Sequence, residues 1–150
     1  MGTAPTFIEI NNEYGVQVSQ AWLTTAWTNI SEQSGNKGKI TDYQLRDMAK
    51  TTVSCYGYLK ISEFMLFALW FKAGRYNHIF GTNVDPLQLM VALRNFIQER
   101  NDMIAHYEQD ERDEARRKEM ESRPPMTWEE YAKKNNIKAD NPLGNLFINP

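Results

Sequence analysis

The chain has 150 residues, of which 12% are aromatic and 24% charged, and its formal net charge is −2. This length allows one domain with a core plus appendages, and the aromatic content argues against global disorder. The small negative charge excludes a general attraction to nucleic acid or anionic membranes, so any such contact would need a local basic patch.

Cysteine content and hydropathy limit the cellular compartments in which we expect the protein. The single cysteine, Cys55, excludes an intramolecular disulfide and is typical of a reducing cytosol. It lies beside Val53 and Tyr56 in a helical pattern, so we expect a small buried hydrophobic residue. No apolar run reaches the roughly 18 residues that a membrane span requires. We therefore expect a cytoplasmic protein that does not contact the membrane.

The chain begins with a segment that we expect to be irregular. Pro5 and Gly15 interrupt any period in residues 1–15, which we interpret as an N-terminal arm. A first helix is predicted over residues 19–33, where apolar residues recur at three and four positions and Ser19 can serve as N-cap.

Two more helices are predicted before the middle of the chain. Thr41 is expected to cap a helix that extends to about Tyr58, and Ser62 is expected to cap the next one, SEFMLFALWFKA. Residues 64–71 of this helix are all apolar, which predicts a helix that is buried on most sides and lies at the centre of the fold.

The fourth helix is predicted to be long and to change character along its length. Asp85 and Pro86 form a strong helix start, and the helix is expected to end near Ser122. After Tyr107, the segment EQDERDEARRKEMESR has little to bury, but it carries opposite charges four positions apart. Residues 108–123 are therefore predicted to form a solvated helical extension.

Residues 124–150 are interpreted as a docking segment. Thr127 and Glu130 predict a capping box at the start of a short helix, and an apolar tip follows near the C-terminus. Helix-in-groove binding uses anchors of this kind. Packing against the protein's own core and self-association are the alternatives. The predicted docking residues are Trp128, Tyr131, Leu143, Leu146 and Phe147.

The most distinctive stretch is FKAGRYNHIFGTNVDP, residues 71–86, which joins the third and fourth predicted helices. Its cations could contact phosphates, and its aromatic residues could stack on bases or fill a pocket of a partner. Alternatively, the aromatic residues fold back onto the bundle while the cations remain outside. Two arginines of the next helix could extend the same surface. The predicted nucleic-acid or partner-binding residues are Lys72, Arg75, Tyr76, His78, Phe80, Arg94 and Arg100.

Motifs for catalysis or metal binding are scarce. The two histidines have no cysteine partner and no HExxH or CxxC spacing, and neither a P-loop nor a GxSxG elbow is present. Asp102, His106 and Asp110 share one helical face, which we interpret as a solvated face and not as a set of metal ligands. We therefore predict no metal, no cofactor and no enzymatic activity.

The run EFMLFALWFKAGRYNHIFGTNVDPLQLMVALRNFIQER resembles a small uncharacterised helical domain of Bacteroides-type bacteria, their phages and mobile elements. The resemblance covers residues 41–100 and implies the cytoplasm of a bacterial host cell, but no biochemical activity. In its layout, the chain is also loosely similar to small helical phage proteins that load or inhibit a replicative helicase through a flexible C-terminal part. The residues that fit the first pattern are Phe71, Lys72, Gly74, Tyr76, Phe80, Gly81, Asp85, Leu93, Phe96, Glu99 and Arg100.

These features predict an all-α protein with a compact bundle of about four helices over residues 16–107, a long charged fourth helix and a helical or extended docking segment. The leading hypothesis is a non-enzymatic accessory or adaptor protein of a phage or mobile element. It would bind a replication protein, with nucleic acid as a further ligand of the 72–81 loop. The alternatives are a virion structural or assembly protein that forms homo-oligomers, and a small inhibitor of a host enzyme or defence system.

Overall fold

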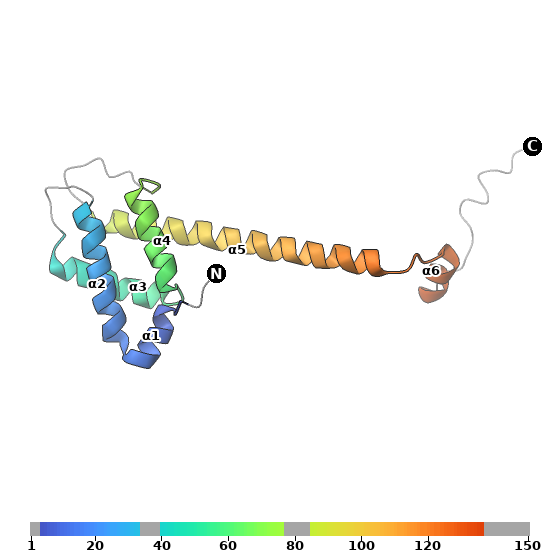
Figure 1. Cartoon of the computed structure of the whole chain (residues 1–150), viewed down its shortest axis with the longest axis horizontal. Coiled ribbons are helices and arrows are strands. Elements are labelled where there is room, and N and C mark those ends of the chain that lie inside the picture. The colour runs from blue at the N-terminus through green and yellow to red at the C-terminus, as the bar shows by residue number, and fades with distance from the viewer. Residues whose placement is uncertain (1–3, 34–39, 77–84, 137–150) are drawn as a thin grey trace, which may run out of the picture. The chain divides into compact units, whose positions relative to one another are not determined.

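A computed structural model describes residues 4–33, 40–76 and 85–136 of the chain (Figure 1). These residues contain helices and no β-strand, so the all-α prediction is confirmed. None of the helices in the described ranges combines the length and the apolar composition that crossing a bilayer requires. The helices are α1 (Phe7–Tyr14), α2 (Val16–Gln33), α3 (Asp42–Tyr56), α4 (Ile61–Lys72), α5 (Pro86–Ser122) and α6 (Trp128–Lys134).

The chain divides into two compact units, with the boundary between Ile104 and Ala105 inside α5. In the described part of the first unit, α1 to α4 and the beginning of α5 form the bundle, which is one helix more than the predicted four. The additional helix is α1, at the place where we expected an irregular arm. The predicted bundle extended slightly further along the same long helix, to residue 107.

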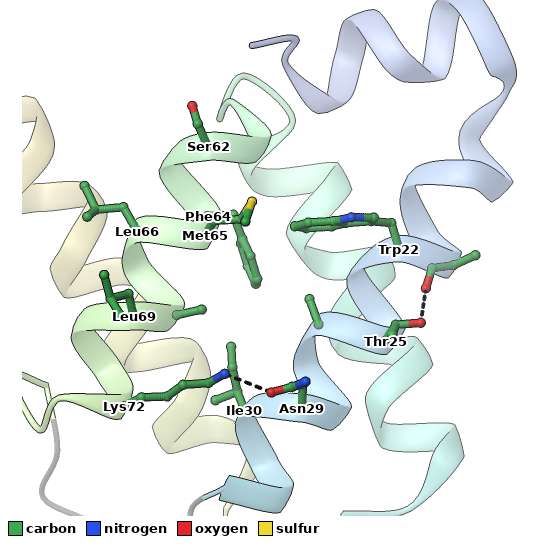
Figure 2. Close-up of a pocket in the computed structure, with 13 residues that line it drawn as sticks. Trp22, Thr25, Asn29, Ile30, Ser62, Phe64, Met65, Leu66, Leu69 and Lys72 are labelled. Carbon is green, nitrogen blue, oxygen red and sulfur yellow. Dashed lines mark hydrogen bonds between the residues drawn. The ribbon is translucent and has the colours of Figure 1, made fainter. Parts of the chain in front are cut away.

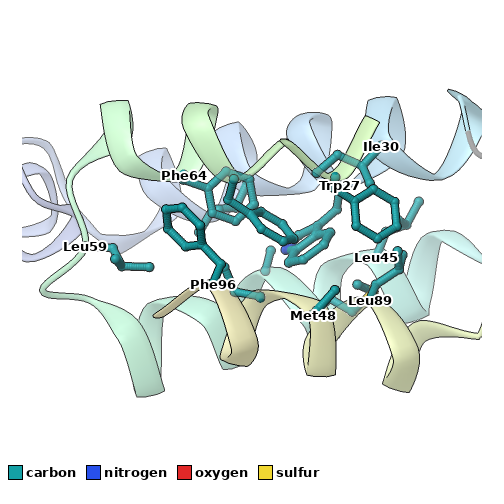
Figure 3. Packing of buried hydrophobic residues seen from close by; sticks show 14 of the residues in the cluster. Trp27, Ile30, Leu45, Met48, Leu59, Phe64, Leu89 and Phe96 are labelled. Carbon is teal, nitrogen blue, oxygen red and sulfur yellow. The ribbon is translucent and has the colours of Figure 1, made fainter. Parts of the chain in front are cut away.

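The core of the first unit is centred on aromatic side chains from α2 and α4 (Figure 3). Trp27, Phe64 and Phe67 are fully buried, and their rings meet edge to face with centroids 5.2–5.8 Å apart. Nε1 of Trp27 donates to Oγ1 of Thr52 at 3.2 Å, and this hydroxyl donates in turn to the carbonyl of Met48 at 2.7 Å. The buried polar groups of this network are therefore paired, as stability requires.

Helix α1 corrects the prediction of an irregular arm. Thr6 and Glu9 form a capping box, which starts the helix despite the unfavourable asparagines that follow. The Phe7 N–H donates to the carbonyl of Leu59 at 3.1 Å, which fixes the start of α1 to the α3–α4 connection. Gly15, with φ of +91°, ends α1 in a conformation that favours glycine and lets α2 begin at the next residue.

Two predicted helix starts are wrong, and at both places the chain makes a hydrogen bond to a residue distant in sequence. Ser19 lies inside α2, where its buried hydroxyl donates to the carbonyl of Phe7 at 3.4 Å and so caps nothing. Helix α4 begins at Ile61 with Lys60, not Ser62, as its N-cap, and the N–H of Ile61 donates to the carbonyl of Pro5 at 3.1 Å. In both places the helix start is set together with a contact that the neighbouring residues do not reveal.

Other predicted starts are confirmed. Thr41 caps α3 in a capping box with Gln44. Oδ1 of Asp85 accepts from the N–H of Leu87 at 2.9 Å, and α5 begins at Pro86 as expected. These predictions depend on contacts between residues two or three positions apart, so sequence alone could give them.

Cys55 is exposed, which contradicts the prediction of a buried thiol. The buried stripe of α3 passes through Ala49 and Thr52 and continues to the half-buried Tyr56. Each helical position is rotated by about 100° from its neighbour, so Cys55 lies beside the stripe and faces solvent.

The second unit begins within α5, and its described helical residues before α6 are all exposed. Glu108 pairs with Arg112 at 3.8 Å and Glu114 with Lys118 at 2.7 Å, as the spacing predicted. In α6, Thr127 and Glu130 form the predicted capping box.

Candidate functional site

The described residues include the first part of the predicted 72–81 loop site, while His78 and Phe80 lie outside them. The guanidinium of Arg75 lies 4.1 Å from the ring centroid of Trp70 and donates to Glu99 at 3.1 Å. The charge of Arg75 is therefore already balanced by a carboxylate of α5.

Tyr76 packs inward, as one of the two alternatives for this loop proposed. Its ring lies 6.2 Å from that of Phe67 and 6.3 Å from that of Phe96. Its hydroxyl donates to Glu99 at 2.7 Å. Burial and this hydrogen bond raise the pKa of Tyr76 to about 12, so the phenol is neutral at physiological pH.

The two predicted arginines of α5 have different surroundings. Nε of Arg100 donates to Oε1 of Glu63 at 2.7 Å, and the two side chains are only 21% and 15% exposed. Arg100 follows the buried residues Phe96 and Ile97 of α5 and joins this helix to the first turn of α4. Arg94 is exposed and forms no ion pair with the described residues. The described residues of the predicted cationic surface therefore do not form a continuous patch of unpaired charge.

Two of the predicted docking residues lie in the described part of the second unit. The rings of Trp128 and Tyr131 are stacked with centroids 5.6 Å apart, and about half of each side chain is exposed. Leu143, Leu146 and Phe147 lie outside the described residues.

A site that the sequence did not predict lies between α2 and α4 (Figure 2). This hollow, here named the α2–α4 groove, has a volume of about 960 Å³ and is lined mainly by apolar side chains. Helix α2 contacts α4 less extensively than it contacts α3, which leaves the space open. Figure 2 shows the Trp22 ring of α2 reaching toward Phe64 and Met65 of α4. The rings of Trp22 and Phe64 meet edge to face at 5.8 Å.

Two large apolar side chains of the groove face solvent. Met65 is 59% and Leu69 is 62% exposed, although both come from the helix that supplies the buried rings of the core. The prediction that α4 is buried on most sides is therefore wrong for this face. Small side chains, Ala21, Ala26 and Ala68, also line the groove and would let another chain approach closely.

Polar side chains mark the two ends of the groove. Ser62 lines it at the start of α4 and Lys72 at its end. Nζ of Lys72 donates to Oδ1 of Asn29 at 2.8 Å and so joins the two helices that form the walls (Figure 2). No carboxylate of the described residues forms an ion pair with Lys72, in contrast to Arg75 and Arg100.

The sequence did contain a signal for this face. Ser62, Met65, Leu69 and Lys72 are spaced by three, four and three positions, which places them on one side of a helix. A stripe that begins with serine and ends with lysine differs from a stripe that faces a core. The unbroken apolar run concealed it, because every face of the helix looked equally apolar.

The side chains that line the groove are suited to binding a ligand. The residues that line it include no His, Cys, Asp or Glu, so among them there is no carboxylate or imidazole to act as a general base. In the described ranges, no cluster of three or more metal-ligating residues occurs either.

Most of the sequence matches a known protein family. A family model matches residues 39–141, which is more than half of the sequence. The chain belongs to the DUF6633 family. This family has no known function, and its match includes α3 to α6 and the segment for which we noted a resemblance, residues 41–100. Helix α2, one wall of the groove, precedes the matched range. Neither a curated protein nor a solved structure matches the chain significantly.

Proposed function

We propose that the chain is a non-enzymatic adaptor that binds another protein by receiving an apolar helix in the α2–α4 groove. The observation that carries this proposal is the exposure of Met65 and Leu69, at 59% and 62%, on the wall of an apolar hollow. Burying side chains of this size contributes about 1.5–3 kcal/mol each. Methionine also adapts its shape easily, which suits a binding surface.

A helical ligand fits this groove better than an extended one. Both walls are helices, whose backbone groups are paired within the helix and offer no ladder to an added strand. A helix satisfies its own backbone and needs only side-chain contacts. From Ser62 to Lys72 the groove follows α4 for about 15 Å, which corresponds to about three turns of a bound helix.

The partner class that we propose is a replication protein of a phage or mobile element. The resemblance of residues 41–100 to a domain of mobile elements supports this proposal, together with the looser similarity to helicase-loading helpers. Nucleic-acid binding through the 72–81 loop has less support among the described residues, because Glu99 and Glu63 already balance the charges of Arg75 and Arg100.

Selection from a library of displayed helical peptides tests the proposal. The full-length protein is the bait, and the Met65→Ser/Leu69→Ser variant serves for counter-selection. We expect enriched peptides with apolar residues at helical spacing that bind the variant at least about tenfold more weakly, since two buried anchors are lost. The control is Leu87→Ser/Met103→Ser, because Leu87 and Met103 are similarly exposed, at 72% and 53%, and lie outside the groove. Peptides that bind both variants equally, or no enrichment, would contradict the proposal.

A further inference from the structure

A second hollow lies on the other side of α2 and is cationic. It has a volume of about 380 Å³ and lies between α2 and α3. No carboxylate of the described residues forms an ion pair with its two cations, Arg46 and Lys50. We name it the cationic hollow, and it is lined by Gln17, Gln20, Ala21, Thr24, Arg46 and Lys50.

The two hollows meet at Ala21, which lines both of them. Alanine has only a methyl group, so the ridge that separates the hollows is low at this position. A helix in the α2–α4 groove could therefore extend a side chain across α2 toward Arg46 and Lys50. At the far end of the groove, the same helix would meet Lys72.

We propose that the groove receives an acidic amphipathic helix, an inference that rests on the proposed function. Its apolar side would contact Met65 and Leu69, and carboxylates on its flanks would pair with Lys72 and with Arg46 or Lys50. Charge complementarity carries the inference. Lys72 lines the groove, and Arg46 and Lys50 line the adjoining cationic hollow. These three cations have no carboxylate partners among the described residues, whereas Arg75 and Arg100 have such partners.

A nucleic acid is the other class of polyanion that these cations could attract. The α2–α4 groove disfavours a nucleic acid, because Met65 and Leu69 would gain nothing from contact with a phosphate backbone. Base stacking would need a free aromatic face, yet Trp22 already packs against Phe64 and Phe7. An acidic peptide satisfies the apolar and the charged features together.

The test uses peptides of about 14 residues from the selection described above. Each peptide is made in three versions, with Glu, Gln or Lys at the positions that flank its apolar side. Fluorescence anisotropy measures their affinity for the full-length protein at about 50 and 300 mM sodium chloride. The Glu peptides are expected to bind about tenfold tighter than the Gln peptides at low salt, and the Lys peptides most weakly. Lys72→Met and Arg46→Gln/Lys50→Gln should each reduce this preference by about threefold or more. The matched control is Arg94→Gln, because Arg94 is exposed and forms no ion pair within the described ranges.

The outcomes separate the two proposals. If the Glu, Gln and Lys peptides bind with equal affinity and Met65→Ser/Leu69→Ser still abolishes binding, the proposal of an acidic partner is overturned and groove binding remains. Failure to enrich any groove-dependent peptide overturns both. An oligo(dT) strand of about 12 nucleotides is the third arm. If it binds and loses affinity in Lys72→Met, a nucleic acid replaces the acidic helix as the ligand.

Discussion

The ammonium group of Lys72 donates a 2.8 Å hydrogen bond to Oδ1 of Asn29 and thereby joins α4 to α2 at one end of the groove. The acceptor is neutral, so the bond leaves the positive charge of Lys72 available to a ligand. Because both groups are exposed, we predict that Lys72→Met changes the free energy of unfolding by less than about 0.5 kcal/mol. Urea denaturation followed by circular dichroism measures this. A loss well above that value would show that the pair holds the two helices together.

Thr52 is predicted to stabilise the core through its hydroxyl. Thr52→Val keeps the shape of the side chain but leaves Nε1 of the buried Trp27 without its acceptor. An unpaired buried donor costs about 1–3 kcal/mol, which should appear as a lower denaturation midpoint. Thr51→Val, at the exposed neighbouring position, is the control and should have little effect. Equal losses in the two variants would contradict this role.

The pair of Glu63 and Arg100 is predicted to couple α4 with α5. A double-mutant cycle with Glu63→Ala and Arg100→Ala should give a coupling energy of about 1–2 kcal/mol, because the two side chains are mostly buried and charged. The exposed pair of Glu108 and Arg112 offers a control, for which we expect about 0.3 kcal/mol. Similar coupling energies for the two pairs would contradict the structural role of the α4–α5 pair.

We predict that Tyr76 makes the stability of the protein fall at alkaline pH. Its pKa in the folded protein is raised to about 12 from the ordinary 10.0, so folding favours the neutral phenol. A raised pKa gives a stabilisation that is complete below pH 10 and is lost as the pH rises toward 12. The denaturation midpoint of the parent protein should therefore fall more steeply over this window than that of Tyr76→Phe. Parallel curves for the two proteins would show that Tyr76 is not responsible.

Gly57 is predicted to be required for the approach of α1 to the α3–α4 connection. A Cβ atom at this position would lie 2.7 Å from the carbonyl oxygen of Val53 and 2.9 Å from a side-chain carbon of Ile8. Gly57→Ala should therefore lower the midpoint of thermal unfolding, because backbone would have to shift. Gly15→Ala meets no neighbouring atom but is strained by its φ of +91°, so it should also lower the midpoint, and Ile8→Ala should not recover that loss. Combining Gly57→Ala with Ile8→Ala should recover part of the loss if the contact is the cause.

Helix starts were predicted correctly where they depend on residues that are close in sequence, and wrongly where distant residues take part. Capping at Thr41, Asp85 and Thr127 involves neighbours in the chain, and it was predicted correctly. Ser19 and Ile61 instead donate hydrogen bonds to Phe7 and Pro5, which are distant in the chain, and both helix starts were misplaced. Nonlocal packing decides which of several polar residues caps a helix.

The candidate site was harder to predict than the fold. A groove exists only where two helices fail to close on each other, and the composition of either helix does not reveal that distance. Met65 and Leu69 lie in a run of apolar residues that predicted burial, and the polar ends of their stripe, Ser62 and Lys72, were a weak signal beside that run. The charged residues of the 72–81 loop stood out in the sequence, yet Arg75 is paired within the protein.

Methyl NMR of methionine tests groove binding most directly. The protein has seven methionines, and selective ¹³C labelling of their methyl groups would report on each while a selected peptide is added. Met65 is expected to shift and to show contacts to the peptide, whereas Met103, with a similar exposure of 53%, and the buried Met48 should stay unchanged. A peptide that saturates the protein while the Met65 signal remains in place would contradict binding in the α2–α4 groove.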